Sequence, residues 1–279
     1  CPISQKIVGH KDGMKHIHEK SIVSIGDPVK RFSEDPVRSL RAIRFSNKLN
    51  FKIDKDIKEA IYEKGHLLSD ISNARLFDEF CKIFLSGMAE KNFNKLSSYG
   101  LSKYLISTDS ERSEFTRNLI VESLRNTDKR LINGQSITPG FLIAALLWPG
   151  LIERSLSRGE INLRKFFRSM DYVLRNQQKI TAVPRKFQSY IKDIWVLQLK
   201  LHSRIGKQPY KTLKHPRFRA AYDLLLLRER ATNKKQDLGK WWTDFQKNDE
   251  NIKKALINDL KEKNMQETPK IFGFSEELR

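Results

Sequence analysis

Cysteine is almost absent from this sequence of 279 residues, in which only Cys1 and Cys81 occur. Two cysteines exclude a disulfide framework and a cysteine-rich zinc site, and they indicate a reducing compartment, for which the cytoplasm is the default. Long apolar runs are also lacking, because the longest, Gly140 to Trp148 and Leu224 to Leu227, are far shorter than a membrane span. No secretory signal opens the sequence. We therefore expect a soluble, cytoplasmic protein without a membrane partner.

Acidic residues are too few to balance the basic ones. The sequence has 53 Lys and Arg residues against 33 Asp and Glu residues, which gives a formal net charge of +20 and a pI of about 9.9. Such an excess predicts a polyanionic partner, and nucleic acid is favoured over a membrane surface because the basic residues are spread along the whole chain. The alternative is a solvated, lysine-rich surface with no such partner.

Several familiar catalytic signatures are missing as well. There is no glycine-rich phosphate loop, no Ser/His/Asp set and no Asp-x-Asp pair on a strand, although two-metal phosphoryl transfer needs closely spaced carboxylates. Asp54 and Asp56 are expected in a helical or turn context, with Asp54 as a helix cap. His16 and His18 alternate on an expected loop or strand, and their spacing does not fit a zinc site. We expect no metal site in this chain.

The expected organisation is mainly helical. Residues 1–27 do not look helical: Val8 to Gly13 resembles a loop, and Ser21 to Ile25 resembles a short strand whose partner strands we expect outside this sequence. After Pro28, apolar residues recur three and four positions apart, with Gly or Pro between many of the segments. The spacing predicts helices over residues 36–47, 54–64, 73–85, 113–124, 139–148, 163–175, 185–201 and 217–230. The charged tail after Asn248 is expected to fray.

The segment from Glu34 to Arg44 is the first candidate site. Pro36 at the first helical position, with Asp35 as cap, fixes the start of a helix, so Leu40 and Ile43 turn toward the protein. The same register places three arginines on one face, namely Arg38, Arg41 and Arg44. Guanidinium groups beside carboxylates suit a ligand with phosphates and a base edge. The alternative is an ordinary helix start with surface arginines.

A second candidate is the stretch from Ile194 to Tyr222, which contains no acidic residue between those two positions. Its basic side chains would follow the phosphates of a nucleic acid, and any exposed aromatic side chains could stack on bases, as in single-strand binding. The alternative is that the aromatics belong to the core. The basic residues are Lys200, Arg204, Lys207, Lys211, Lys214, Arg217 and Arg219, and the aromatics are Trp195, Tyr210, Phe218 and Tyr222.

Several segments together resemble the class II nucleotidyltransferases, which include the bacterial poly(A) polymerases and the CCA-adding enzymes. The segments are Gly13-Met-Lys, Ile25-Gly-Asp-Pro and Arg31-Phe-Ser-Glu-Asp-Pro-Val-Arg-Ser-Leu-Arg-Ala-Ile-Arg-Phe45. Later segments resemble the body of bacterial poly(A) polymerases more than CCA-adding enzymes: Ala74-Arg-Leu-Phe-Asp-Glu79, Asp193-Ile-Trp-Val-Leu-Gln198, His215-Pro-Arg-Phe-Arg-Ala-Ala-Tyr-Asp-Leu-Leu225 and Trp241-Trp-Thr-Asp-Phe-Gln246. The resemblance runs from about residue 8 to residue 246.

The resemblance implies a multi-helical neck and body after a short β remnant of a catalytic head. It divides the chain into the end of the head (1–27), a nucleotide-selecting neck (28–108), an RNA-binding body (109–247) and a charged, flexible tail (248–279). It also implies that Glu34, Asp35 and Arg38 select ATP by reading its base edge, with Arg41 and Arg44 toward the phosphates. RNA 3′ ends would be the second substrate, and proteins of RNA degradation would be partners.

The family's reaction adds AMP units from ATP to RNA 3′ ends with the help of Mg²⁺. The family's Gly-Gly, Asp-x-Asp and Arg-Arg-Asp motifs are absent from this sequence, so the chain is expected to be inactive alone. Gly9, Asp12 and His16 also depart from the family pattern in the loop before the neck. Two alternatives stay open: a non-catalytic RNA-binding module, and a CCA-adding tRNA nucleotidyltransferase.

Overall fold

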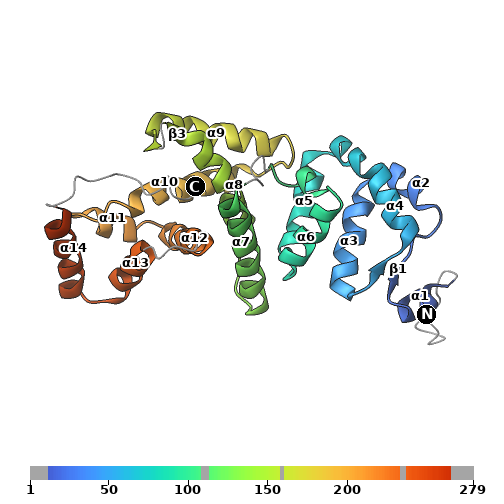
Figure 1. Cartoon of the computed structure of the whole chain (residues 1–279), viewed down its shortest axis with the longest axis horizontal. Helices are drawn as coiled ribbons and strands as arrows, with labels where there is room; N and C mark the ends of the chain where they lie inside the picture. The colour runs from blue at the N-terminus through green and yellow to red at the C-terminus, as the bar shows by residue number, and fades with distance from the viewer. Residues whose placement is uncertain (1–11, 108–112, 158–159, 233–236, 265–279) are drawn as a thin grey trace.

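The computed structural model describes residues 12–107, 113–157, 160–232 and 237–264, and it confirms a mainly α-helical fold. The helices follow one another along an elongated molecule, from α1 at one end to α14 at the other (Figure 1). The first half contains α1 (Gly13–His18), β1 (Ser21–Ile22), α2 (Pro28–Glu34), α3 (Val37–Leu49), β2 (Lys52–Ile53), α4 (Lys55–Lys64), η1 (Gly65–Asp70), α5 (Asn73–Phe84), α6 (Ala89–Ser98) and η2 (Ser102–Tyr104).

The second half of the chain is built in the same way. It contains α7 (Glu114–Ile132), α8 (Pro139–Ser155), β3 (Leu156–Ser157), β4 (Glu160–Ile161), α9 (Leu163–Gln178), α10 (Arg185–Leu201), α11 (Gln208–Leu213), α12 (Phe218–Ala231), α13 (Asp237–Lys247) and α14 (Glu250–Asn264). β3 and β4 form a small antiparallel pair. Within the described ranges, no helix combines the length and the apolar character needed to cross a membrane.

The N-terminal elements correct two expectations. The strand expected at Ser21 to Ile25 is only two residues long, and its partner lies within this chain, because β1 pairs in parallel with β2. The backbone N–H of Lys52 donates to the carbonyl of Lys20 at 2.7 Å, and that of Asp54 donates to Ile22 at 3.1 Å. His16 and His18 lie in helix α1, so the expected loop or strand there is wrong. Residues 1–11, including Gly9, lie outside the described residues.

The helix starts near the first candidate site are close to their expected positions. Helix α3 begins at Val37, one residue later than expected, and the carboxylate of Asp35 accepts from the N–H of Val37 at 3.3 Å. Asp54 caps α4 by accepting from the N–H of Asp56 at 3.0 Å, which confirms its expected role. Helix α3 ends at Leu49, and the left-handed backbone of the following Asn50 (φ 54°) turns the chain toward β2.

Several helices extend beyond their expected ends, among them α7, which runs to Ile132, and α9, which runs to Gln178. Helix α8 continues through Pro149 to Ser155, although a proline inside a helix removes a backbone hydrogen bond. Packing compensates for this loss, because α8 is buried along nearly its whole length and contacts α7, α9 and α10. The tail expected to fray instead forms α14 up to Asn264, where Ile257 is buried against the C-terminal core. Residues 265–279 of that tail lie outside the described residues.

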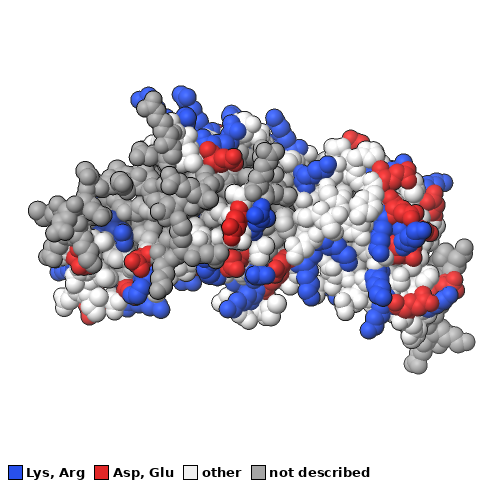
Figure 2. All heavy atoms as spheres, in the orientation of Figure 1, with Lys and Arg blue, Asp and Glu red and all other residues white. Residues whose placement is uncertain are grey.

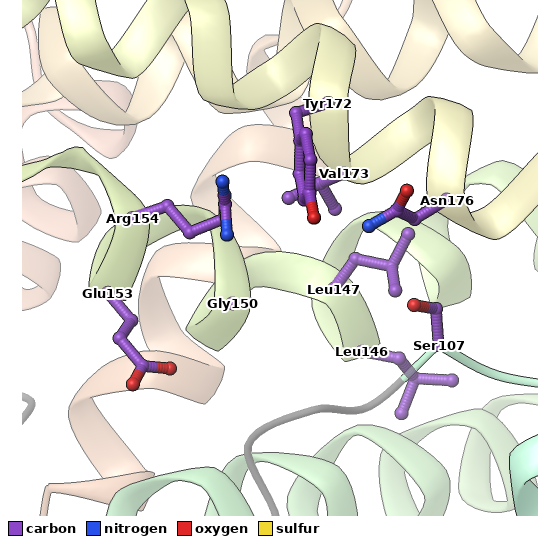
Figure 3. Close-up of a pocket in the computed structure, with 9 residues that line it drawn as sticks. All are labelled: Ser107, Leu146, Leu147, Gly150, Glu153, Arg154, Tyr172, Val173 and Asn176. Carbon is purple, nitrogen blue, oxygen red and sulfur yellow. The ribbon is translucent and has the colours of Figure 1, made fainter.

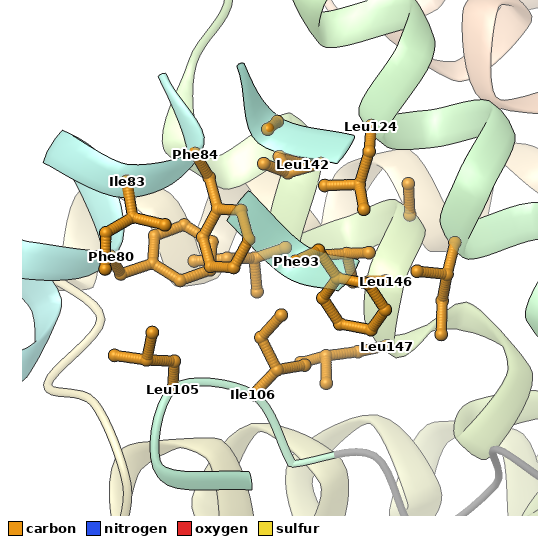
Figure 4. Packing of buried hydrophobic residues seen from close by; sticks show 14 of the residues in the cluster. Phe80, Ile83, Phe84, Phe93, Leu105, Ile106, Leu124, Leu142, Leu146 and Leu147 are labelled. Atoms are coloured by element: carbon orange, nitrogen blue, oxygen red, sulfur yellow. The ribbon is translucent and has the colours of Figure 1, made fainter. Parts of the chain in front are cut away.

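One large hydrophobic core extends from α2 to α12. In Figure 4, Phe80 and Phe84 of α5 pack close to Phe93 of α6, and this group continues to Leu142 and Leu146 of α8. The expected boundary at 108/109 falls outside the described residues, and the core continues from one side of it to the other. Polar links cross the same region, because the Asn73 side chain donates to the carbonyl of Gln178 at 2.8 Å. The first candidate site therefore rests on the same core as the body.

A second, smaller core lies among α10 to α14. Helices α10 and α12 contribute to both cores: Ile194 and Leu224 belong to the large one, and Leu201 and Leu225 to the small one. A buried polar pair also joins α10 and α12, in which Arg228 donates to the side-chain oxygen of Gln198 at 2.7 Å. The small C-terminal core is thus joined to the large core through α10 and α12.

Candidate nucleotide site and nucleic-acid interface

Two carboxylates and three arginines meet where α2 passes into α3. Glu34 ends α2, and its Oε2 lies 3.1 Å from Nη1 of Arg31 and 3.5 Å from Nη1 of Arg38. Asp35 joins the two helices, and both of its oxygens lie 2.9 Å from Nη2 of Arg75 on α5. The Nε of Arg38 is 3.9 Å from Asp35. The structure therefore brings Glu34, Asp35 and Arg38 together, as the sequence predicts.

Arg31 and Arg75 are members of this group that sequence reasoning did not single out as site residues. The Nε of Arg31 donates to the carbonyl of Ile25 at 3.1 Å, and this hydrogen bond fixes the side chain. Arg75 is forty positions from Asp35 in the sequence, so only the fold reveals their contact. Three arginines against two carboxylates leave an excess of one positive charge, and the side chains of Arg31, Arg38 and Arg75 are each about two fifths exposed. The group can therefore accept an anionic or hydrogen-bonding ligand from solvent.

Arg41 has a different setting, because it faces a buried carboxylate of α5. Nη2 of Arg41 lies 3.5 Å from Oε1 of Glu79, whose side chain is only 1% exposed, and Nζ of Lys82 lies 2.9 Å from the same oxygen. The other oxygen of Glu79 is buried without a hydrogen bond from any described residue. A buried carboxylate needs cations close by, so Glu79 fixes Arg41 and Lys82 at this edge. Arg75 and Glu79 are four residues apart, so both lie on one face of α5, and the structure shows that this face meets α3.

Arg44 is the third arginine of the expected row, and it contacts neither carboxylate group. Its guanidinium lies over the ring of Phe45, 4.4 Å from the centroid. Its Nε is buried and donates no hydrogen bond to any described residue. The row of three arginines therefore divides into Arg38 beside Asp35, Arg41 beside Glu79, and Arg44 beside an aromatic ring. Leu40 and Ile43 between them are buried, as expected.

The basic stretch around α11 is largely exposed. Lys200, Lys207, Lys211 and Lys214 are exposed, and none has an ion-pair partner among the residues that the structure describes. The remaining three basic residues have partners: Arg219 pairs with Asp223 at 3.1 Å, Arg217 lies over Tyr190, and Arg204 lies 5.4 Å from the ring centroid of Trp241. Burial lowers the pKa of Arg204, and nearby Asp237 opposes this shift. The lysines are therefore the side chains of this stretch that are available to phosphates.

The aromatic residues of the same stretch belong mainly to the core. Trp195, Phe218 and Tyr222 are buried, and Nε1 of Trp195 donates to the carbonyl of Ala144 at 2.9 Å. Tyr210 is partly buried and packs on Phe245, with 5.3 Å between ring centroids. The alternative that the aromatics are core residues is therefore correct for Trp195, Phe218 and Tyr222. Apolar spacing in a helix produces the same pattern as a stacking surface, so the sequence alone did not separate the two.

Basic side chains are not confined to one place on the molecule. Figure 2 shows Lys and Arg side chains along the face in view, with acidic side chains mixed among them at the α2–α4 end. No group of three or more His, Cys, Asp or Glu side chains that could hold a metal ion occurs among the described residues. The distribution fits a long polyanion better than a single small anion.

Comparisons with known proteins identify two regions of this chain. Residues 50–108 match the family model described as "Probable RNA and SrmB- binding site of polymerase A", and residues 158–271 match "Polymerase A arginine-rich C-terminus". The chain is 37% identical over 261 residues to Poly(A) polymerase I of Salmonella typhi, covering 89% of this chain and 56% of the relative. Poly(A) polymerase I of Escherichia coli O157:H7 gives 37% identity over 263 residues, with 90% and 56% covered. The chain thus spans just over half the length of these relatives.

Weaker similarity extends to tRNA-processing proteins. A CCA-adding enzyme of Lactococcus lactis is 26% identical over 231 residues, covering 83% of this chain and 52% of the relative. The fold resembles a solved structure titled "tRNA-processing enzyme (apo form 2)", with a TM-score of 0.57, 18% identity, and coverage of 90% of this chain and 67% of that one. The chain is therefore related to the bacterial poly(A) polymerases over about nine tenths of its own length, and two of its regions match polymerase A family models.

Proposed function

We propose that this chain forms the neck and body of a poly(A) polymerase that adds AMP from ATP to RNA 3′ ends. The observation that carries the proposal is the meeting of Glu34, Asp35 and Arg38 at the start of α3, within a chain 37% identical to bacterial poly(A) polymerases. In this proposal the neck selects the nucleotide and the body holds RNA. RNA processing in the cytoplasm is part of the same proposal.

The geometry suits the reading of an adenine edge. The carboxylate of Asp35 can accept from the exocyclic amine, while Arg38 can donate to a ring nitrogen, so the pair acts as a base-pairing partner would. Arg75 contacts both oxygens of Asp35 and Glu34 contacts Arg38, and these contacts hold the two reading groups in place. Arg41 and Arg44 would lie toward the phosphates, with Glu79 restraining Arg41.

Mg²⁺ belongs to the reaction by family resemblance, but the described residues do not fit a magnesium site. Hard divalent cations need a cluster of oxygen ligands, and the described part of the chain lacks a suitable cluster. The carboxylates of Glu34 and Asp35 are already bound to arginines. Any Mg²⁺ ligands would therefore come from outside the described residues, and in this proposal the described residues position the nucleotide and the RNA.

The proposed partners are RNA 3′ ends and proteins of RNA degradation. Support for RNA comes from the match of residues 50–108 to a family model for an RNA-binding region and from the unpaired lysines near α11. The description of that family model also names SrmB, which makes this region our candidate for protein contacts.

Nucleotide use by the full-length gene product tests the proposal. Incubation with RNA and each nucleotide separately should extend the RNA with ATP alone. Equal use of CTP would instead favour the CCA-adding alternative, which the similarity to the Lactococcus lactis enzyme keeps as the second candidate. A full-length product that binds RNA but extends it with no nucleotide would favour the non-catalytic RNA-binding module.

A further inference from the structure

A cavity opens between α8 and α9, away from both the Asp35 group and the lysines near α11. Its volume is about 320 Å³, at the small end of the range for ligand pockets, and a single nucleotide base fits such a space. Leu146, Leu147 and Gly150 of α8 line it on one side, and Tyr172 and Asn176 of α9 line it on the other.

The cavity lining includes one carboxylate, that of Glu153, and one wall formed by a guanidinium and an aromatic ring. The guanidinium of Arg154 lies over the ring of Tyr172, with its central carbon 3.6 Å from the ring centroid, and Figure 3 shows it turned toward that ring. Tyr172 is 37% exposed, unlike the buried Trp195, Phe218 and Tyr222 of the α11 region. Proteins that bind single-stranded RNA stack bases on aromatic rings and on arginine guanidinium planes. This wall presents both.

A polar group lies beside that wall. Asn176 follows Tyr172 by four residues in α9, so the two side chains share a face, and both line the cavity (Figure 3). The side-chain amide of Asn176 forms no hydrogen bond with any described residue. An amide can donate and accept at once, as the edge of a nucleobase requires.

Two further features suit a base that is part of an RNA strand and not of a free nucleotide. Gly150 leaves the cavity open at α8, because a Cβ atom placed there would meet no other atom within 4 Å. Outside the cavity, Arg164, Arg168 and Arg175 are exposed on α9 and have no ion-pair partner among the described residues. Arg168 and Arg175 lie four and three positions from Tyr172, so they flank it on the helix surface. A free nucleotide would not need such a row, whereas successive phosphates would.

We propose that the cavity between α8 and α9 is a subsite for one base of single-stranded RNA, stacked on the Arg154–Tyr172 pair and hydrogen-bonded by Asn176. The RNA backbone would follow the arginines of α9. This inference rests on the proposed RNA-binding function, and it adds a contact that the basic stretch, with its buried aromatics, does not supply.

Fluorescence anisotropy of a labelled oligoadenylate with the whole chain tests the subsite. Tyr172→Ala should raise Kd by roughly 5- to 150-fold, the range for loss of one stacked base. The slope of log K against log salt should stay the same, because no phosphate contact is removed. Gly150→Leu, which fills the cavity, should weaken binding to a similar extent. Phe167→Ala is the matched control, because it removes an exposed aromatic side chain of α9 that does not line the cavity, and it should bind like the wild type.

The outcomes separate the subsite from the wider proposal. Wild-type binding together with unchanged Kd values for Tyr172→Ala and Gly150→Leu would overturn the subsite and leave the proposed function standing. A wild-type chain that binds no oligoadenylate would overturn both. If AMP protects Tyr172 from chemical modification and the oligoadenylate does not, the cavity takes a free nucleotide, and the assignment to an RNA chain is wrong.

Discussion

The lysines near α11 allow a quantitative test of RNA binding. Lys207 and Lys211 are exposed and have no ion-pair partner among the described residues, so their replacement removes positive charge without breaking an internal contact. Each lysine on a phosphate contributes about 0.7 to the slope of log K against log salt for a single strand. Lys207→Gln with Lys211→Gln should therefore reduce that slope by about 1.4.

The slope also sets how the affinity loss changes with salt. Between about 50 mM and about 200 mM salt, the difference of about 1.4 in slope corresponds to about a 7-fold change in the ratio of the two Kd values. The double variant should thus be impaired most at low salt. Charge reversal at the same positions should weaken binding further, because the new carboxylates repel phosphates.

Anisotropy titrations of a labelled single-stranded RNA over a salt series would measure both slopes. The matched control is Lys48→Gln with Lys129→Gln, which changes the net charge equally at two other exposed lysines, on α3 and α7. Its slope should equal that of the wild type. Equal slopes for the wild type and the Lys207/Lys211 variant would refute the assignment of phosphate contacts to this stretch, and an equal loss in the control would show a general charge effect.

Three further predictions concern selection and stability. Arg38→Ala should weaken ATP binding roughly 10-fold and reduce the preference for ATP over CTP, as measured by calorimetry; an unchanged preference would contradict the role of Arg38. Asp128→Ala should lower the free energy of unfolding by about 1–3 kcal/mol in urea, because the carboxylate accepts from the N–H groups of Ala89 (2.6 Å) and Glu90 (3.1 Å); Asp128→Asn should lose less. Burial and the nearby Arg228 and Arg204 lower the pKa of His202 to about 3. Below about pH 6.5, His202 takes up a proton in the unfolded state but stays neutral in the folded state. The free energy of unfolding should therefore fall by up to about 1.4 kcal/mol for each unit that the pH drops between about pH 6.5 and pH 3. His202→Gln should make this dependence shallower in urea titrations at several pH values, and identical profiles would contradict the prediction.

Sequence patterns located the strongly periodic helices well. The bounds expected for residues 185–201 match those of α10, because its apolar positions recur regularly and Pro184 precedes it. Helix α8 was expected to end at Trp148, since proline disfavours a helix interior, and only its burial by neighbouring helices explains why it continues. The two-residue partner of β1 was missed, because so short a segment has no period to detect.

The candidate site was predicted in part for a similar reason. Glu34, Asp35 and Arg38 lie within five residues of one another, so their closeness in the sequence predicted that they would meet. Arg75 and Glu79 reach the same region through the packing of α5 against α3, and no local pattern encodes that contact. The division of the aromatics between core and surface also depends on neighbours distant in the sequence. Buried Trp195 and exposed Tyr172 illustrate this, since both lie in amphipathic helices.

The sharing of α10 and α12 by two hydrophobic cores has a consequence for folding cooperativity. Melting of α13 and α14 would uncover Leu201 and Leu225, but Ile194 and Leu224 of the same two helices would remain in the large core. Loss of α10 or α12 would instead expose both cores and break the buried hydrogen bond between Arg228 and Gln198. The C-terminal helices should therefore exchange their amide hydrogens through local opening, whereas α10 and α12 exchange only when the whole body unfolds.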